Sequence, residues 1–188
     1  MFEYLQILYN TRGDTTLENG VEIISKAVNT RGTFEKQEIG WINFTKVSEA
    51  NMQMTPPNNC YSPFTYITNK EQNTNQNRAI IAFTRKPGMI IGYDYNGGDW
   101  TKSIPLTDKS EYIIGLFIPD SNVKFKNTDL TLEEYLRGSE AAVHNGWNDT
   151  IIAASKKKQN VVTRIQSKVN SAIKDTYSVS TKKAEHND

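Results

Sequence analysis

Short runs of isoleucine, phenylalanine and tyrosine alternate with turn residues through the middle of the chain. The runs cover residues 78–85, 89–95 and 112–118. Pro87-Gly88 follows the first run and suits a type II turn, and Asn96-Gly97 follows the second and suits a type I′ turn. Runs rich in β-branched and aromatic residues with turn dipeptides between them are typical of antiparallel strands. The pattern therefore predicts a β-meander, with strands on both sides of each turn and a positive φ at Gly97.

The N-terminal third carries a strand pattern, a helix pattern and a second strand pattern. Residues 2–9 alternate loosely and are rich in β-forming residues, so we expect a strand there. Apolar residues recur at spacings of four, three and four across residues 17–28, which predicts a helix. Residues 39–47 read as a strand that carries Trp41. Weaker β patterns lie at residues 64–68, 100–106 and 123–125.

Helical signals dominate after residue 127. Thr131 and Glu134 have the spacing of a capping box, in which each side chain bonds the backbone N–H of the other residue, so a helix should start just after Thr131. Asn145-Gly146 should interrupt it, and a second helix is expected to begin near Asp149 or Thr150. That second helix carries an apolar stripe at helical spacing, formed by Ile151, Ile152, Val162, Ile165, Val169, Ala172 and Ile173.

These patterns together predict an α+β fold. We expect an antiparallel β-meander sheet with one N-terminal helix and two C-terminal helices. Residues 1–127 should form a mainly β domain with one helix, and residues 128–177 a helical segment packed on it. Residues 178–188 are polar and should form a flexible tail.

Composition narrows the function classes only slightly. The chain has 188 residues and a formal net charge of +1, which gives no global argument for nucleic acid or for an anionic surface. Its one cysteine allows no intramolecular disulfide, and no apolar run approaches the length of a membrane span. We therefore expect a cytoplasmic protein without a membrane-spanning segment. The abundance of Asn, Lys and Ile hints at an AT-rich genome, such as that of a microbe or phage.

Residues capable of catalysis gather at the junction between the two C-terminal helices. His144 and Asp149 could act as a general base with its orienting partner, and Cys60 with His144 is the minimum for a thiol hydrolase, with Asp149 or Asn148 as the third member. The simpler interpretation makes Asp149 a helix N-cap, Trp147 a packing anchor and Cys60 a small buried hydrophobe. We favour the simpler interpretation and lean towards a protein that is not an enzyme.

No cofactor or metal site is predicted. The chain has only two histidines, and no His or Cys pair has the spacing of zinc ligands. Asp94, Asp99 and Asp108 lie around the predicted hairpins but lack the downstream glutamate of a calcium loop. Turn formation is sufficient to explain them.

The C-terminal helix is the strongest candidate for a binding element. We expect its apolar stripe to be too long for the small sheet to cover, and its opposite face is basic, so one helix offers two kinds of surface. The first hypothesis is a non-catalytic binding or assembly module that engages a protein partner or a second copy of itself. The alternatives are a nucleic-acid-associated protein that uses the basic face, and the thiol hydrolase. The candidate binding residues are Val162, Ile165, Val169 and Ile173 on the stripe, and Lys157, Arg164, Lys168 and Lys174 on the basic face.

Overall fold

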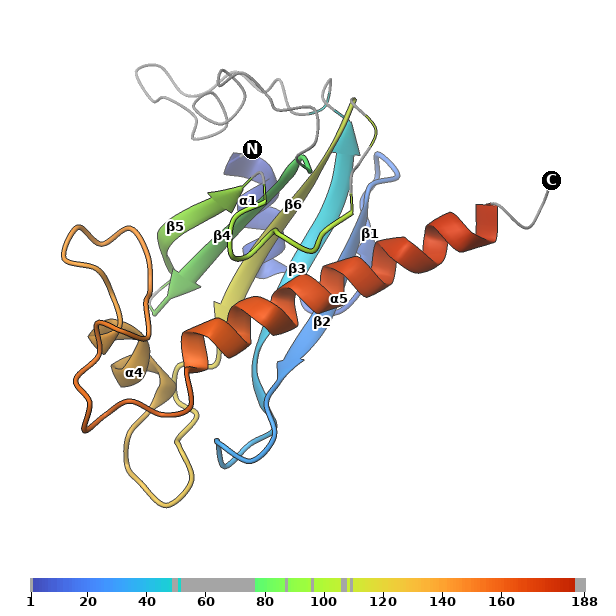
Figure 1. The fold of residues 1–188 in the computed structure, drawn as a ribbon. Helices are drawn as coiled ribbons and strands as arrows, with labels where there is room; N and C mark the ends of the chain where they lie inside the picture. The colour runs from blue at the N-terminus through green and yellow to red at the C-terminus, as the bar shows by residue number, and fades with distance from the viewer. Residues whose placement is uncertain are drawn as a thin grey trace.

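A mixed six-stranded sheet forms the centre of the protein in the computed structural model, which describes residues 2–48, 51, 77–86, 88–95, 97–105, 108 and 110–184. Figure 1 shows the arrangement of its elements. The helices are α1 (Phe2–Asn10), α4 (Leu132–Gly138) and α5 (Val161–Ala184). The strands are β1 (Thr15–Thr16), β2 (Glu22–Asn29), β3 (Glu38–Ser48), β4 (Ala79–Arg85), β5 (Met89–Tyr95) and β6 (Glu111–Pro119).

The strand order departs from a meander, although the α+β class is confirmed. The order is β1-β2-β3-β6-β4-β5, so β6 lies between β3 and β4. β6 pairs antiparallel with β3 but parallel with β4. The remaining neighbouring pairs are all antiparallel. The expected wholly antiparallel meander is therefore wrong. The central place of β6 explains its almost continuous apolar sequence, because both of its faces are buried.

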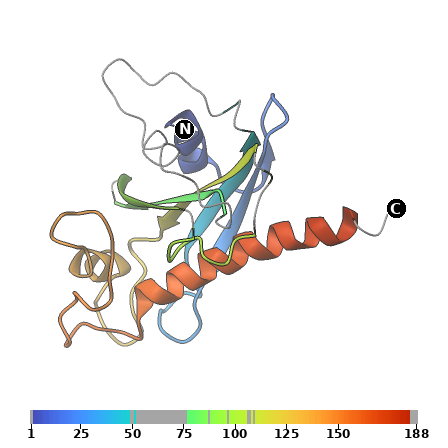
Figure 2. The same cartoon turned by 45° about the horizontal axis from the view of Figure 1, so that its top comes forward.

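Helices cover both faces of the sheet, and each face has its own core. Figure 2 shows α1 and α5 on opposite sides. Alternate residues of β4 divide between the two cores: Ile80 packs with α1, whereas Ile81 and Phe83 belong to the core that contains α5. The protein is thus built of three layers, with the short α1 on one side and the long α5 on the other.

Two predictions in the N-terminal third are wrong. Residues 2–9 form most of α1 rather than a strand, and Tyr4, Leu5 and Leu8 bury the face that meets the sheet. Residues 17–28 contain a tight turn and β2 rather than a helix. Gly20, with φ of +80°, closes the turn, and β2 then pairs with β3 along its length. The β3 prediction is confirmed, since residues 39–47 lie within that strand.

The two turns in the middle of the chain have different outcomes. Strands β4 and β5 flank Gly88, as predicted, while Pro87 lies outside the described residues. Gly97 has the predicted positive φ of +86°, but residues 97–105 contain no strand, and Asn96 is outside the described residues. Instead the carboxylate of Asp94 accepts hydrogen bonds from Trp100 N at 2.8 Å and Thr101 Oγ1 at 3.1 Å. These bonds tie Asp94, near the end of β5, to Trp100 and Thr101. The strand predicted at 100–106 is absent from 100–105.

Two weaker strand predictions have separate outcomes. Lys124 and Phe125 make isolated bridges instead of the strand predicted at 123–125. Residues 64–68 lie outside the described part of the chain.

The capping box is confirmed, whereas the start of the second C-terminal helix is wrong. Thr131 N donates to Glu134 Oε2 at 2.8 Å, and Glu134 N donates to Thr131 Oγ1 at 3.2 Å. α4 then begins at Leu132. The next helix, α5, begins at Val161 rather than near Asp149, because residues 149–160 form turns and Gln159 and Asn160 have positive φ. α5 also continues to Ala184, through much of the segment predicted as a tail.

None of the helices in the described part of the chain combines the length and the hydrophobicity that crossing a bilayer demands.

Candidate functional site

The predicted cluster of His144, Trp147 and Asp149 is dispersed in the structure. His144 is largely exposed, and its Nδ1 lies 2.5 Å from Glu140 Oε1. Trp147 is buried against Phe83, with their ring centroids 5.0 Å apart, which confirms its role as a packing anchor. Asp149 turns towards α4 and α5 instead. The general base that the sequence offered, His144 oriented by Asp149, is therefore not assembled.

Asp149 caps the N-terminus of a helix, but that helix is α5, which starts twelve residues after Asp149. Its two carboxylate oxygens accept hydrogen bonds from Val162 N and Thr163 N, both at 3.0 Å, and from Thr163 Oγ1 at 2.9 Å. The hydroxyl of Tyr135 in α4 donates to the same carboxylate at 2.8 Å. Burial alone would raise the pKa of Asp149, but the hydrogen bonds from Thr163 and Val162 outweigh it and hold the pKa below its ordinary value. The charged carboxylate thus ties α4 to the start of α5.

Cys60 lies outside the described residues, so its pairing with His144 stays a prediction. Across the described residues, no group of three or more His, Cys, Asp or Glu side chains is placed to hold a metal ion.

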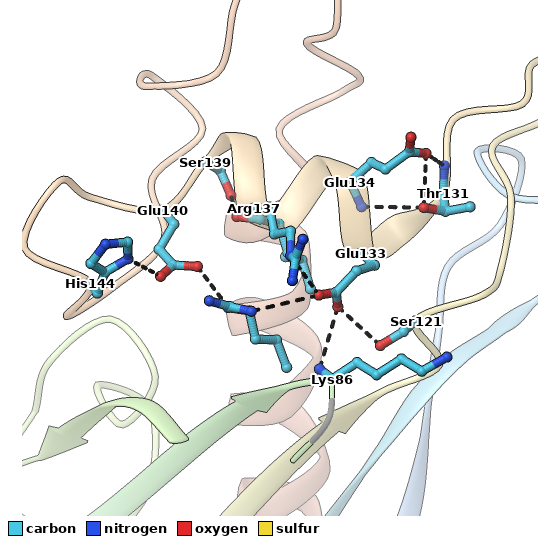
Figure 3. A network of polar contacts seen from close by, with 11 residues as sticks. Lys86, Ser121, Thr131, Glu133, Glu134, Arg137, Ser139, Glu140 and His144 are labelled. Carbon is cyan, nitrogen blue, oxygen red and sulfur yellow. Dashed lines mark hydrogen bonds and ion pairs between the residues drawn. The ribbon is translucent and has the colours of Figure 1, made fainter. Parts of the chain in front are cut away.

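Glu140, whose carboxylate faces His144, belongs to an ionic network between α4 and the end of β4 (Figure 3). Glu140 contacts Arg85, whose Nε lies 3.0 Å from Glu140 Oε2 and whose Nη1 lies 3.9 Å from Glu133 Oε1. Glu133 also accepts from Arg137 at 3.1 Å and from the hydroxyl of Ser121 at 3.2 Å. The two carboxylates are nearly buried, so they compensate the charge of Arg85 and fix its position.

The predicted apolar stripe of α5 packs on the protein's own sheet. Val162, Ile165, Val169 and Ile173 are each at most 2% exposed and belong to the core between α5 and the sheet. The surface that the sequence offered to a partner is therefore occupied by the protein itself. These side chains anchor α5 to the sheet.

The four residues of the predicted basic face of α5 lie in different environments and make different contacts. Lys157 lies in the loop before the helix. The guanidinium of Arg164 donates to Thr33 Oγ1 at 2.6 Å and to Arg31 O at 3.3 Å, so it clamps the β2–β3 loop to α5. Lys168 and Lys174 remain on the exposed side of the helix. A continuous cationic face for a phosphate backbone is therefore not formed by these four residues.

The face of the sheet opposite α5 contains a groove that the sequence did not predict. α1 has nine residues and rises about 14 Å, whereas the eleven residues of β3 extend about 36 Å. α1 therefore covers only part of this face. Next to its C-terminal end lies a groove of about 550 Å³, within the size range of small-molecule sites. Its lining includes Tyr9, Arg12, Trp41, Arg85, Lys86 and Asp120.

Aromatic and cationic side chains meet in this groove. The guanidinium carbon of Arg12 lies 3.7 Å from the ring centroid of Trp41, so the indole holds the cation against the sheet. Lys86 follows the end of β4, and Trp41 lies on β3. No sequence signal joins Arg12, Trp41 and Lys86, because three separate elements bring them together.

Comparisons with known proteins reveal no relative. No protein-family model, no curated protein and no solved structure matches the chain. What the protein does must therefore be inferred from its own side chains.

Proposed function

We propose that the protein is a non-catalytic binding and assembly module that engages another protein, in the simplest case a second copy of itself, through the distal end of α5. The observation that carries the proposal is that the backbone of α5 continues past the edge of the sheet. Figure 1 shows its C-terminal end reaching beyond the edge of the sheet.

The first two thirds of α5 are held firmly by contacts along their length. Asp149 caps the first turn, and the apolar stripe fills the core. Farther along, Asn170 Nδ2 donates to Asp99 O at 2.8 Å, and Asn170 Oδ1 accepts from Ser103 N at 3.2 Å. A helix fixed in this way presents its far end in a defined direction, which lowers the entropic cost of binding.

Among the side chains that the structure describes, Tyr177 is the last in α5 with a ring contact to the sheet. Its ring centroid lies 5.7 Å from that of Phe44, and Lys46 Nζ lies 4.7 Å from the Tyr177 ring centroid. The helix then continues through residues 178–184, which at 1.5 Å per residue adds about 10 Å. Short helical segments gain most of their stability from packing, so two further turns beyond Tyr177 suit a helix that docks on a partner.

Deleting residues 178–188 tests the proposal, with deletion of residues 185–188 as the matched control. The full chain and the control should associate reversibly in sedimentation velocity between 5 and 200 μM, a range of about fortyfold in concentration chosen to span weak affinities. The longer deletion should sediment as a monomer and keep the near-ultraviolet circular dichroism of the parent. Association that survives this deletion would refute the proposal, as would a full chain that is monomeric throughout and binds no other protein by its helix end.

A further inference from the structure

The groove beside α1 carries a second inference, which is independent of α5 because the groove lies on the other face of the sheet. We propose that this groove binds a small organic phosphate monoester, with the phosphate at Arg12 and Lys86 and the organic part on the apolar floor.

The charges that line the groove favour an anion. Arg12, Arg85 and Lys86 supply three cations, against the single carboxylate of Asp120. Arg85 is already compensated by Glu133 and Glu140, which contact it from the α4 side. Among the described residues, no carboxylate lies within ion-pair distance of the Arg12 or Lys86 side chain.

Asp120 does not neutralise those two cations, because other groups engage it. Its Oδ2 lies 3.8 Å from Lys36 Nζ, and its Oδ1 accepts from Asn122 N at 3.3 Å. Within the described part of the chain, two positive charges therefore stay uncompensated in the groove. A phosphate monoester carries close to two negative charges at neutral pH and has three acceptor oxygens, so it matches this pair better than a carboxylate does.

The floor of the groove suits an apolar or aromatic organic group. Ile118 and Pro119, at the end of β6, lie there beside Trp41, while Tyr9 at the end of α1 forms part of the wall. Gly88 packs against Tyr9 in the same wall: a Cβ at this position would lie 2.6 Å from the hydroxyl of Tyr9. A groove with an apolar floor and a few convergent polar groups is typical of small-molecule sites.

Trp41 provides a direct reporter of binding. The protein has three tryptophans, and the other two, Trp100 and Trp147, are buried together in the core on the α5 side. In nitrogen-15 spectra of the full chain, phenyl phosphate should therefore shift one indole N–H signal in a saturable manner, and Trp41→Phe should remove that signal. Inorganic phosphate and benzoate, which lack the organic group and the second charge respectively, should each bind about tenfold more weakly.

Variants of the two cations complete the test. Arg12→Gln and Lys86→Gln should each weaken phenyl phosphate binding about five- to tenfold. Lys102→Gln makes the same change of charge on an exposed loop that contacts α5, and it should leave the affinity unaltered. The proposal is overturned if the Trp41 signal does not move, if benzoate binds as tightly as phenyl phosphate, or if all three variants weaken binding equally. Circular dichroism of each variant shows that its fold is retained.

Discussion

Replacing Asp149 with alanine removes four hydrogen bonds that meet at one buried carboxylate. Val162 N and Thr163 N lose the acceptor that caps α5, and the hydroxyl of Thr163 loses its partner. The buried hydroxyl of Tyr135 is also left without its acceptor at 2.8 Å. The substitution therefore perturbs the start of α5 and its connection to α4 at the same time.

The size of the effect follows from these contacts. Loss of a helix N-cap costs about 1 kcal/mol, and a buried hydroxyl left without its partner costs about 1–3 kcal/mol. We expect Asp149→Ala to lower the free energy of unfolding by about 3 kcal/mol. Asp149→Asn keeps one acceptor oxygen but loses the charge, so it should cost about half as much.

The pH dependence gives an independent check on the same carboxylate. The pKa of Asp149 is lower in the folded protein than its ordinary value. A group with a depressed pKa stabilises the fold above its unfolded-state pKa, and that contribution is lost as the pH falls through the folded-state pKa. The part of the stability that comes from Asp149 should therefore be present at pH 7 and disappear below about pH 4, the ordinary range of an aspartate.

Urea unfolding of the parent and both variants, at pH 7 and at pH 3, measures these differences. The difference in the free energy of unfolding between the parent and Asp149→Asn should be clear at pH 7 and should be smaller at pH 3. A change of less than about 0.5 kcal/mol for Asp149→Ala at pH 7, the size of an ordinary surface substitution, would refute the capping role.

Three further substitutions have definite expected outcomes. Thr131→Ala should lower the free energy of unfolding by about 1 kcal/mol through loss of the α4 cap, and overlapping urea curves would contradict the capping box. Gly40→Ala should destabilise by about 2 kcal/mol or more, since its Cβ would lie 2.4 Å from the backbone oxygen of Ile118, and a thermal melt equal to that of the parent would show that the strands can shift. A third variant replaces Lys157, Lys168 and Lys174 with glutamate, and association through the end of α5 should tolerate this change. Tight, salt-sensitive oligonucleotide binding that only this variant loses would favour the nucleic-acid alternative.

Features defined by nearby residues could be predicted from the sequence. The capping box of α4 depends on two side chains three positions apart, and β3 shows its apolar positions directly. The strand prediction for α1 is wrong because the composition of residues 2–9 favours strands, although Tyr4, Leu5 and Leu8 have helical spacing. The helix prediction for β2 is wrong because pairing with β3, a tertiary effect, overrides the spacing of its apolar residues.

Features that join distant parts of the chain could not be predicted. No local sequence pattern indicates that β6 pairs with β4 in parallel. Asp149 caps α5 through an amide that lies thirteen positions away in the sequence. The groove has the same origin, because Arg12 and Trp41 meet only when α1 and β3 are packed. Such sites arise from the topology, which a single sequence does not display.

Hydrogen exchange along α5 at two protein concentrations tests the proposed assembly most directly. Amides of residues 178–184 should exchange rapidly at 5 μM and become protected at 200 μM, concentrations on the order of those that separate free from associated protein for weak binding. Amides from Ile165 to Ile173, a stretch that Ile165, Val169 and Ile173 anchor in the core, should not change. Exchange in residues 178–184 that is independent of concentration, and unaltered when another protein is bound, would contradict the account.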